Sequence, residues 1–215
     1  MPSRWRGGTG VSSTPARIAA PGSAQGLSTT AVPVPELPAS VEELAAAAAI
    51  RLGWHGVVLP EMVLMGRKVV VVAELLADAH AERVCVGAGP EADKTTVSTW
   101  VWPEMEGRVP PCAVRIVGVL AVARHWRTAL ASAVPFARYG NAAVVLPDSV
   151  AFTNDYLTNC LPRVRRYGVS VLLADDEKDL SVDVSGRNEC VPVEDTAITR
   201  WVNELVYEQV LATAS

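Results

Sequence analysis

Apolar residues in this 215-residue chain gather in four short runs, separated by longer stretches of mixed polarity. The runs are VVVV within residues 68–75, VRIVGVLAV at 114–122, NAAVVLP at 141–147 and VSVLLAD at 169–175. Continuous apolar runs of this length, rich in valine, are typical of strands that are covered on both faces. The pattern therefore predicts a central sheet with helices packed against it.

Around these runs the apolar residues follow the period of a helix. The stretch SVEELAAAAAIRLGW carries an N-cap in Ser40, acids in its first turn, where the helix dipole favours negative charge, and a stop in Gly53. Three more helices are expected, over about 124–139, in parts of 151–168 up to Gly168, and over about 194–212 after a cap near Asp195. Pro135 lies inside the first of these and should kink it or end it early.

Further segments indicate additional strands. HGVVLPEMVLMG predicts a short strand and a turn around Met65 and Gly66. AERVCVGAG (81–89) is a strand candidate. Residues 95–102 alternate between apolar and polar side chains as a half-exposed strand does, which places Trp100 and Trp102 on one face. There the two rings either stack on a base or a partner, or cover the sheet. Strands that alternate with helices predict an α/β fold, here as one domain over 40–215.

Residues 1–39 are dense in Gly, Ser, Thr, Pro and Ala and show no sustained period. Such a composition buries too little apolar surface to offset the entropy of ordering, so we expect a disordered tail. It resembles a linker more than an organellar transit peptide, although it contains arginine and few acids. No stretch is apolar enough for a membrane span or a secretory signal, so a cytoplasmic protein is expected.

Composition excludes some kinds of site. The four cysteines (Cys85, Cys112, Cys160 and Cys190) form no CxxC pair, and the three histidines (His55, His80 and His125) show no metal-binding spacing. No glycine array matches a phosphate-binding loop. The net charge is −4, and an acidic body is a poor non-specific binder of nucleic acid, although local basic patches remain compatible with it.

The order of the predicted elements resembles that of the restriction-endonuclease-like, or PD-(D/E)XK, superfamily. Three stretches carry the resemblance: RLGWHGVVLPEMVLMGRKVVVVAEL, VRIVGVLAVARHWRTALASAVPFARYGNAAVVLPDS and LPRVRRYGVSVLLADD, which together span about residues 40–180. The resemblance implies a central mixed sheet flanked by helices. It also implies a site at which two carboxylates and a lysine converge on a divalent metal ion that activates water.

The catalytic positions of that family do not carry its chemistry in this chain. The aspartate position falls on Val70, and the acid-x-Lys positions fall on Gly118, Val119 and Leu120. None of these residues can bind a metal or transfer a proton. The resemblance therefore implies a pseudo-nuclease, a non-catalytic protein without a metal or other cofactor, which acts as a nucleic-acid-associated or protein-interaction module.

An alternative is a metal-dependent nuclease whose acids have been relocated. Glu61, Glu74, Asp93 and Lys94 would then converge around Mg²⁺ or Mn²⁺. This hypothesis competes with a simpler interpretation in which the glutamates are strand-end charges and Asp93 and Lys94 belong to a solvated turn.

Two groups of residues are candidates for contacts with partners. Six arginines are candidates to bind the phosphates of DNA, or form a solvated helix face: Arg124, Arg127, Arg138, Arg163, Arg165 and Arg166. Trp201, Leu205 and Val206 on the last predicted helix are candidates for homodimerisation or for docking on a protein partner. DNA, RNA and protein partners are not distinguished by the sequence.

Overall fold

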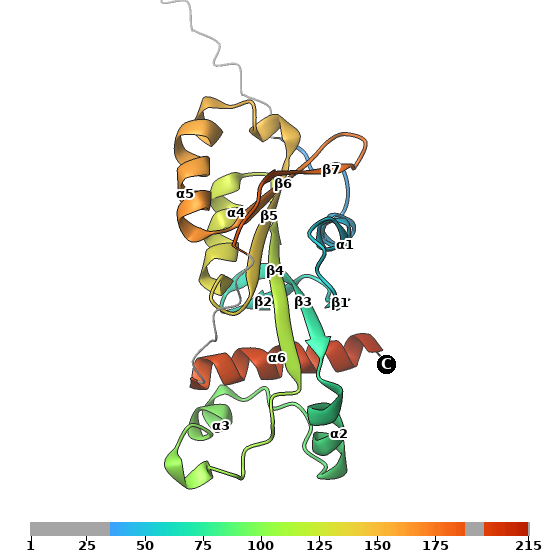
Figure 1. Cartoon of the computed structure of the whole chain (residues 1–215), viewed down its shortest axis with the longest axis vertical. Coiled ribbons are helices and arrows are strands. Elements are labelled where there is room, and N and C mark those ends of the chain that lie inside the picture. Colours follow the sequence, from blue (N-terminus) through green and yellow to red (C-terminus); the bar gives the residue numbers. More distant parts are fainter. Residues whose placement is uncertain (1–34, 188–195, 215) are drawn as a thin grey trace, which may run out of the picture. The chain divides into compact units, whose positions relative to one another are not determined.

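The valine-rich runs form the centre of a mixed sheet (Figure 1). The structure is a computed structural model that describes residues 35–187 and 196–214. Within these residues seven strands pair in the order β1-β3-β4-β5-β6-β7, with β2 also on β3. The strands are β1 (Val57–Val58), β2 (Met62–Leu64), β3 (Arg67–Leu75), β4 (Val114–Val122), β5 (Asn141–Pro147), β6 (Ser170–Ala174) and β7 (Leu180–Val184). The predicted α/β class is confirmed.

The sheet is parallel in its centre and antiparallel on either side. β3 runs antiparallel to β1, β2 and β4, and β7 runs antiparallel to β6. β4, β5 and β6 are parallel, which requires a crossover after β4 and another after β5. The first consists of α4 (Trp126–Ala133) and the 3-10 turn η2 (Val134–Phe136). The second consists of the 3-10 turn η3 (Asp148–Val150), the π-helical turn η4 (Tyr156–Cys160) and α5 (Leu161–Tyr167).

Alternate side chains of each strand point to opposite faces of the sheet. On β3, Val69 and Val71 pack in the cluster beneath α6 (Ala197–Ala214), whereas Val70 and Val72 pack in the cluster beneath α1 (Val41–Arg51). All four valines are at most 1% exposed, so the prediction of a strand covered on both faces is confirmed.

Helices cover both faces of the sheet. α1 lies on one face, and α4, α5 and α6 lie on the other, with α4 and α5 over the parallel strands and α6 across β3 and β4 (Figure 1). Beyond the ends of β3 and β4 lie α2 (Ala77–Cys85), α3 (Lys94–Thr99) and the 3-10 turn η1 (Pro103–Met105).

Local signals in the sequence placed several boundaries correctly. The hydroxyl of Ser40 accepts a hydrogen bond from the amide of Glu43 (3.2 Å) at the start of α1. α5 ends at Gly168, which adopts a φ of 68° that favours glycine. Pro135 ends α4 by converting its last turn to a 3-10 turn.

The strand predicted over residues 81–89 is wrong, because residues 81–85 form the end of α2 and residues 86–89 form the turn and loop that follow it. The alternation of Arg83, Val84, Cys85 and Val86 resembles that of a half-buried strand. In the structure the arginine is fully buried, whereas Val84 and Val86 are 63% and 70% exposed. Burial is therefore inverted relative to polarity, and the pattern misled the prediction.

The strand predicted over residues 95–102 is also wrong. Asp93 caps the short helix α3 by accepting hydrogen bonds at 2.8 Å from the amide and the hydroxyl of Thr96. Trp100 is the C-cap of this helix, so it does not share a strand face with Trp102.

Three other features either differ from the predictions or involve residues outside the described part of the chain. β7 was not predicted. The last helix begins at Ala197 in the described residues, and the expected cap at Asp195 lies outside them. Most of the predicted tail over 1–39 also lies outside the described residues, and in its described end Leu37 and Ala39 pack against the cluster beneath α1.

Candidate functional site

The positions that correspond to the nuclease motif lie together on neighbouring strands. Val70 is opposite Leu120, and Val72 is opposite Gly118, on β3 and β4. Val70 and Leu120 point into the cluster beneath α1 and are at most 1% exposed, whereas Val119 packs in the cluster on the other face. An ionised side chain in so apolar a position would lose its hydration without a partner, which costs several kcal/mol or more.

A tryptophan fills the space above Gly118. A Cβ atom at this position would lie only 2.3 Å from Cζ3 of Trp54, so no side chain fits here unless the indole moves. Trp54 follows the first helix and is 9% exposed. The place of an acid-x-Lys motif is thus occupied by aromatic packing.

Each of the four residues of the relocated-site hypothesis has another partner. Glu61 pairs with Lys68 (3.4 Å) and Glu74 pairs with Arg115. Lys94 lies 5.4 Å from the centroid of the Trp201 ring. Asp93 caps α3, and the hydrogen bonds from Thr96 hold the pKa of its carboxyl below its usual range.

These four residues do not converge. Met62 pairs with Val69 on β3, so the backbone of Glu61 lies beside that part of β3. Measured along the strand direction, this point is about 13–17 Å from the backbone of Glu74. Ligands of one metal ion each lie only about 2.0–2.6 Å from it, so the two carboxylates are too far apart to share a metal. No group of three His, Cys, Asp or Glu side chains in the described part of the chain is placed to hold one metal ion. The structure does not assemble the site that the relocated nuclease requires.

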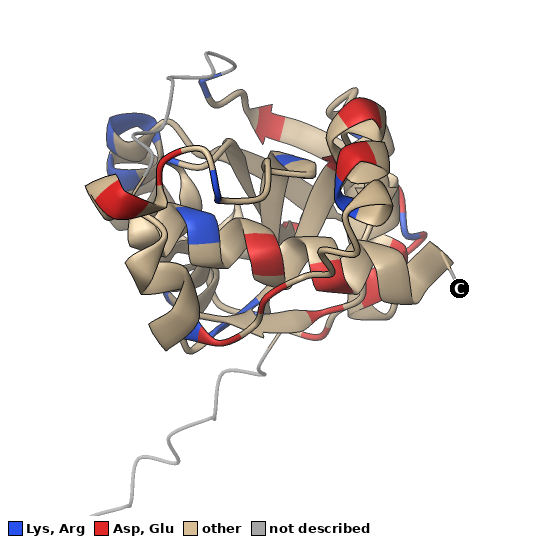
Figure 2. Cartoon of the chain, turned by 90° about the horizontal axis from the view of Figure 1, so that it is seen from below, with Lys and Arg blue, Asp and Glu red and all other residues tan. Residues whose placement is uncertain are grey.

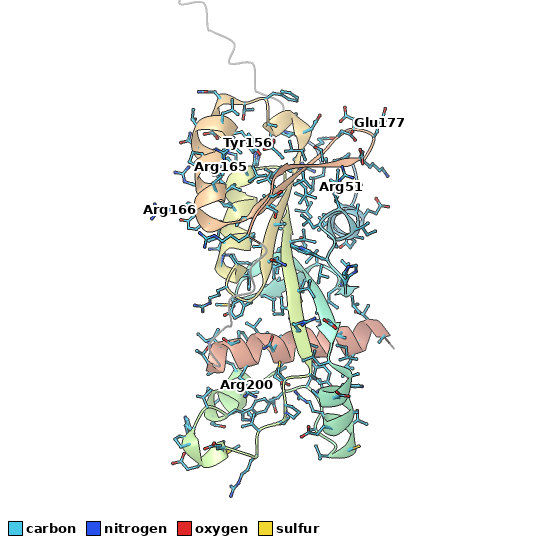
Figure 3. All side chains as sticks on the ribbon, viewed as in Figure 1. Arg51, Tyr156, Arg165, Arg166, Glu177 and Arg200 are labelled. Atoms are coloured by element: carbon cyan, nitrogen blue, oxygen red, sulfur yellow. The ribbon has the colours of Figure 1, made fainter. Side chains whose placement is uncertain are left out.

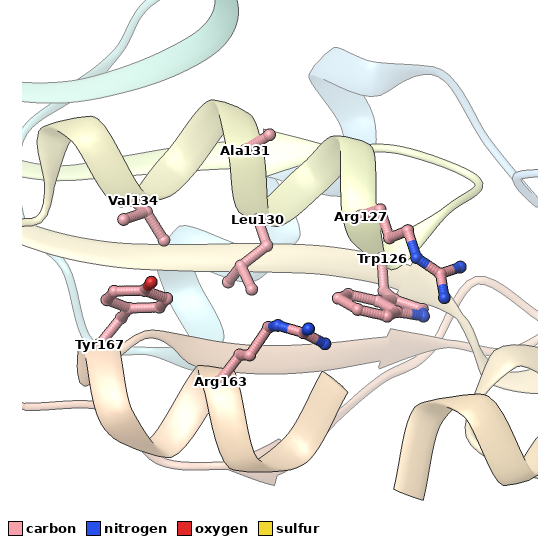
Figure 4. A pocket seen from close by; sticks show the side chains of 7 residues that line it. All are labelled: Trp126, Arg127, Leu130, Ala131, Val134, Arg163 and Tyr167. Carbon is pink, nitrogen blue, oxygen red and sulfur yellow. The ribbon is translucent and has the colours of Figure 1, made fainter. Parts of the chain in front are cut away.

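One arginine of α4 and one of α5, in contrast, border a common hollow of about 350 Å³. Figure 4 shows its lining residues, which are Trp126, Arg127, Leu130, Ala131, Val134, Arg163 and Tyr167. We call this hollow the α4–α5 pocket. Two of the six predicted arginines, Arg127 and Arg163, line it from opposite helices.

The basic end of the pocket is built around Trp126. The guanidinium carbon of Arg127 lies 4.5 Å from an indole centroid, and that of Arg163 lies 5.5 Å from it. The indole N–H donates to Asp155 at 2.8 Å, and Arg127 donates to the other oxygen of the same carboxylate at 2.8 Å. The tryptophan is 6% exposed, so it forms a fixed base against which two exposed cations lie.

The π-helical turn before α5 places the groups on its side of the pocket. Pro162 lacks an amide hydrogen and cannot donate to the helix, which is consistent with a change of register just before it. Asn159 in this turn donates to Asp155 (2.8 Å), and its carbonyl accepts from Arg163 (2.8 Å). π-Helical turns are frequent at functional sites.

The pocket keeps an excess of positive charge. The indole N–H of Trp126, followed by the amide of Asn159, holds the pKa of Asp155 below its usual range, so this carboxylate is ionised at neutral pH. It neutralises one guanidinium, that of Arg127. Among the described carboxylates none forms an ion pair with Arg163.

The remaining predicted arginines divide into two groups. Arg165 and Arg166 lie on α5 (Figure 3), and Arg124 immediately precedes α4, so all three are close in sequence to pocket residues. They are exposed, and no described carboxylate pairs with any of them. Arg138 does not line the pocket, and its guanidinium lies 5.3 Å from the ring of Tyr139.

Of the three residues predicted for dimerisation or docking, one lies in the core of the chain and two are half-buried beside it. Val206 on α6 is fully buried in the cluster between this helix and the sheet, and Trp201 and Leu205 pack against the same cluster. The indole N–H of Trp201 donates to the carbonyl of Ala92 (2.9 Å). Val206 therefore belongs to the core, and the prediction of an interaction surface that includes Trp201 and Leu205 stays a prediction.

A second hollow, of about 310 Å³, lies beside Trp54. His55, Asn141 and the Glu74–Arg115 ion pair line it. The carboxylate is already paired with Arg115, and the Asn141 amide donates to the carbonyl of Val117 (3.2 Å).

Sequence reasoning missed Tyr167 as a residue of the pocket and Asp155 as the partner of Trp126 and Arg127. Tyr167 is four positions after Arg163, which places both on one side of α5, and this spacing was a usable signal. Nothing local indicated Asp155, because its partners Trp126 and Arg127 precede it by 29 and 28 positions.

Comparisons with protein-family models, with curated proteins and with solved structures give no match for this chain. The resemblance to the restriction-endonuclease-like superfamily thus stays a hypothesis from sequence pattern and element order. In the described part of the chain no helix combines the length and the apolar character needed to cross a membrane.

Proposed function

We propose that this chain is a non-catalytic nucleic-acid-binding protein on a restriction-endonuclease-like scaffold. The α4–α5 pocket and the neighbouring arginines would contact phosphates. The observation that carries the proposal is the arrangement of Arg127 and Arg163 on either side of the pocket, with Arg124, Arg165 and Arg166 nearby and without described ion pairs.

The distribution of charge supports this location. Residues 124–166 hold six arginines and two aspartates, a net charge of +4 in a chain of net charge −4. Acidic residues (red) recur along α6 toward the C-terminus in Figure 2, far from this segment in sequence. A local excess of arginine within an acidic protein directs a polyanion to one surface.

The absence of catalysis is part of the proposal. Its support is the apolar packing of Val70, Leu120 and Gly118 against α1 and Trp54, since an acid at these positions would be buried without a partner. Such a protein would hold nucleic acid without cleaving it.

Binding can be measured by fluorescence anisotropy over a series of salt concentrations. The probe is a labelled oligothymidine of roughly 20 nucleotides, longer than the ~4–16 nucleotides that a single binding fold covers. We expect a linear fall of log K with log salt. The double variant Arg163→Ala/Arg166→Ala should bind more weakly, and its slope should be smaller by about 1.4, because each phosphate contact to a single strand contributes about 0.7.

A matched control is Arg51→Ala, an exposed arginine on α1 at the opposite face of the sheet. Its affinity and slope should equal those of the unmodified protein. An equal loss in the control and in the double variant would refute the assignment of the site. No binding at low salt to single- or double-stranded probes would refute nucleic-acid binding altogether and would favour a protein partner.

A further inference from the structure

The two ends of the α4–α5 pocket differ in chemistry (Figure 4). Trp126 with Arg127 and Arg163 forms the basic end, whereas Leu130 and Val134 on the α4 side, with Tyr167 on α5, form an apolar and aromatic end. A surface that only contacted phosphates would need the basic end alone. The apolar end indicates a ligand that carries a flat or apolar group next to an anion.

Tyr167 is suited to stack on such a group. It is the last residue of α5, and the αL conformation of Gly168 (φ 68°) turns the chain immediately after it. The residue is 45% exposed, and its ring lies at the pocket opposite Val134 (Figure 4). An exposed aromatic ring beside an apolar wall offers one stacking face and one packing face to a nucleobase.

Among the described residues that line the pocket, Tyr167 is also the only exposed aromatic ring. The indole of Trp126 is buried, its N–H is bonded to Asp155, and its surroundings include both arginines. It therefore acts as a rigid support that positions the two guanidinium groups. Stacking is left to Tyr167 at the other end.

We propose that the α4–α5 pocket takes one unpaired nucleobase of single-stranded nucleic acid, stacked on Tyr167, while Arg127 and Arg163 bind an adjoining phosphate. This inference rests on the nucleic-acid binding proposed above and goes beyond it by naming the substrate class. The pocket of about 350 Å³ is at the small end of the range of ligand sites, which suits one base.

The geometry disfavours a duplex at the same place. In a duplex the faces of the bases are stacked on one another, and only their edges and the phosphates are accessible. A duplex would use the guanidinium groups of Arg127 and Arg163 and leave the apolar end unoccupied. A single strand occupies both ends, because its bases can be splayed out onto aromatic side chains.

The test compares oligothymidine with a duplex of equal length in the full chain and in two variants at position 167. Tyr167→Ala removes the ring, and Tyr167→Phe keeps it. We expect Tyr167→Ala to weaken binding of oligothymidine at least about five-fold, the lower end of what one stacked base contributes, and to leave duplex binding unchanged. Tyr167→Phe should retain the single-strand affinity, which also controls for a folding defect.

The outcomes separate this inference from the function on which it rests. If Tyr167→Ala weakens neither probe, or both equally, the unpaired-base proposal is overturned, while a loss in Arg163→Ala/Arg166→Ala still supports phosphate binding at this site. Weaker binding of single strands than of duplex by the unmodified protein would also overturn it. If neither probe binds, both proposals fail together.

Discussion

Removal of Glu204 should destabilise the fold more than any exposed substitution, because it leaves a buried arginine without its counter-ion. Arg83 on α2 donates to both carboxylate oxygens of Glu204 on α6, at 2.6 and 2.7 Å, and their side chains are 0% and 4% exposed. The amide of Glu91 donates to the same carboxylate (2.9 Å). This single carboxylate therefore joins α2, the segment before α3, and α6.

The expected size follows from the burial of the pair. Removing one member of a buried ion pair costs about 3–5 kcal/mol, because the other charge stays desolvated and unpaired. For Glu204→Leu we therefore expect a loss of this size, equivalent to a fall in Tm of about 6–20 °C for a domain of this length. Glu204→Gln should also lose stability, since its amide group turns a donor toward Arg83 or the amide of Glu91.

The measurement is urea unfolding followed by tryptophan fluorescence, with the double variant Arg83→Met/Glu204→Leu as the control. Arg83 also donates to the carbonyls of Ala88, Gly89 and Pro111, so the double variant should recover only part of the loss. Its destabilisation should nevertheless be smaller than the sum of the two single losses by about 2 kcal/mol or more. Additive effects, or a loss below about 1 kcal/mol for Glu204→Leu, would show that the pair is not energetically coupled.

Three further predictions concern the core and the pocket. Gly118→Ala should cost about 1–3 kcal/mol in urea unfolding, because its methyl group overlaps the ring of Trp54, and a cost near zero would contradict this packing. The lowered pKa of Asp155 implies that its ionised carboxylate stabilises the folded protein. This contribution is fully present above about pH 4 and is lost as the pH falls through the lowered pKa. If Asp155→Asn and the unmodified protein unfold identically in acid, this contribution is excluded. Burial raises the pKa of Cys160 to about 11, whereas Cys85 is exposed. In thiol labelling at about pH 8, followed by peptide mass spectrometry, Cys85 should therefore react in the folded protein and Cys160 only after unfolding. Equal labelling rates of the two cysteines would refute this.

The central strands could be predicted because their sequence signal is local. Val69–Val72 and residues 118–121 and 142–147 are buried on both faces, so their composition alone indicates a covered strand. Ser40, Pro135 and Gly168 acted within one turn of their own position, and each placed an element boundary correctly.

The error over residues 81–89 occurred where a distant partner decides the structure. Arg83 is polar but buried, and its partner Glu204 is 121 residues away, so no window around residues 81–89 contains the reason for its burial. The exposure of Val84 and Val86 follows from the same rotation of α2. An alternating pattern was therefore interpreted as a strand, although it belongs to a helix whose inner face is charged.

The candidate site divides in the same way. The arginines of α4 and α5 were identified from sequence, and the structure brings Arg127 and Arg163 to one pocket. The distance between their helices depends on the parallel pairing of β4, β5 and β6, which positions both crossovers on one face of the sheet. The role of Asp155 depends on that arrangement, because its partners Trp126 and Arg127 lie 29 and 28 positions before it, whereas the spacing of Tyr167 from Arg163 was a local signal.

The packing of α6 has a consequence for synthesis of the chain. Val202, Val206, Tyr207 and Val210 close the apolar cluster over β3 and β4, yet about 75 residues separate β4 from this helix. At about 5–20 residues per second, a ribosome makes this stretch in roughly 4–15 s. During that interval the apolar cluster over β3 and β4 lacks the side chains of α6, and exposed apolar surface of this kind is what chaperones bind.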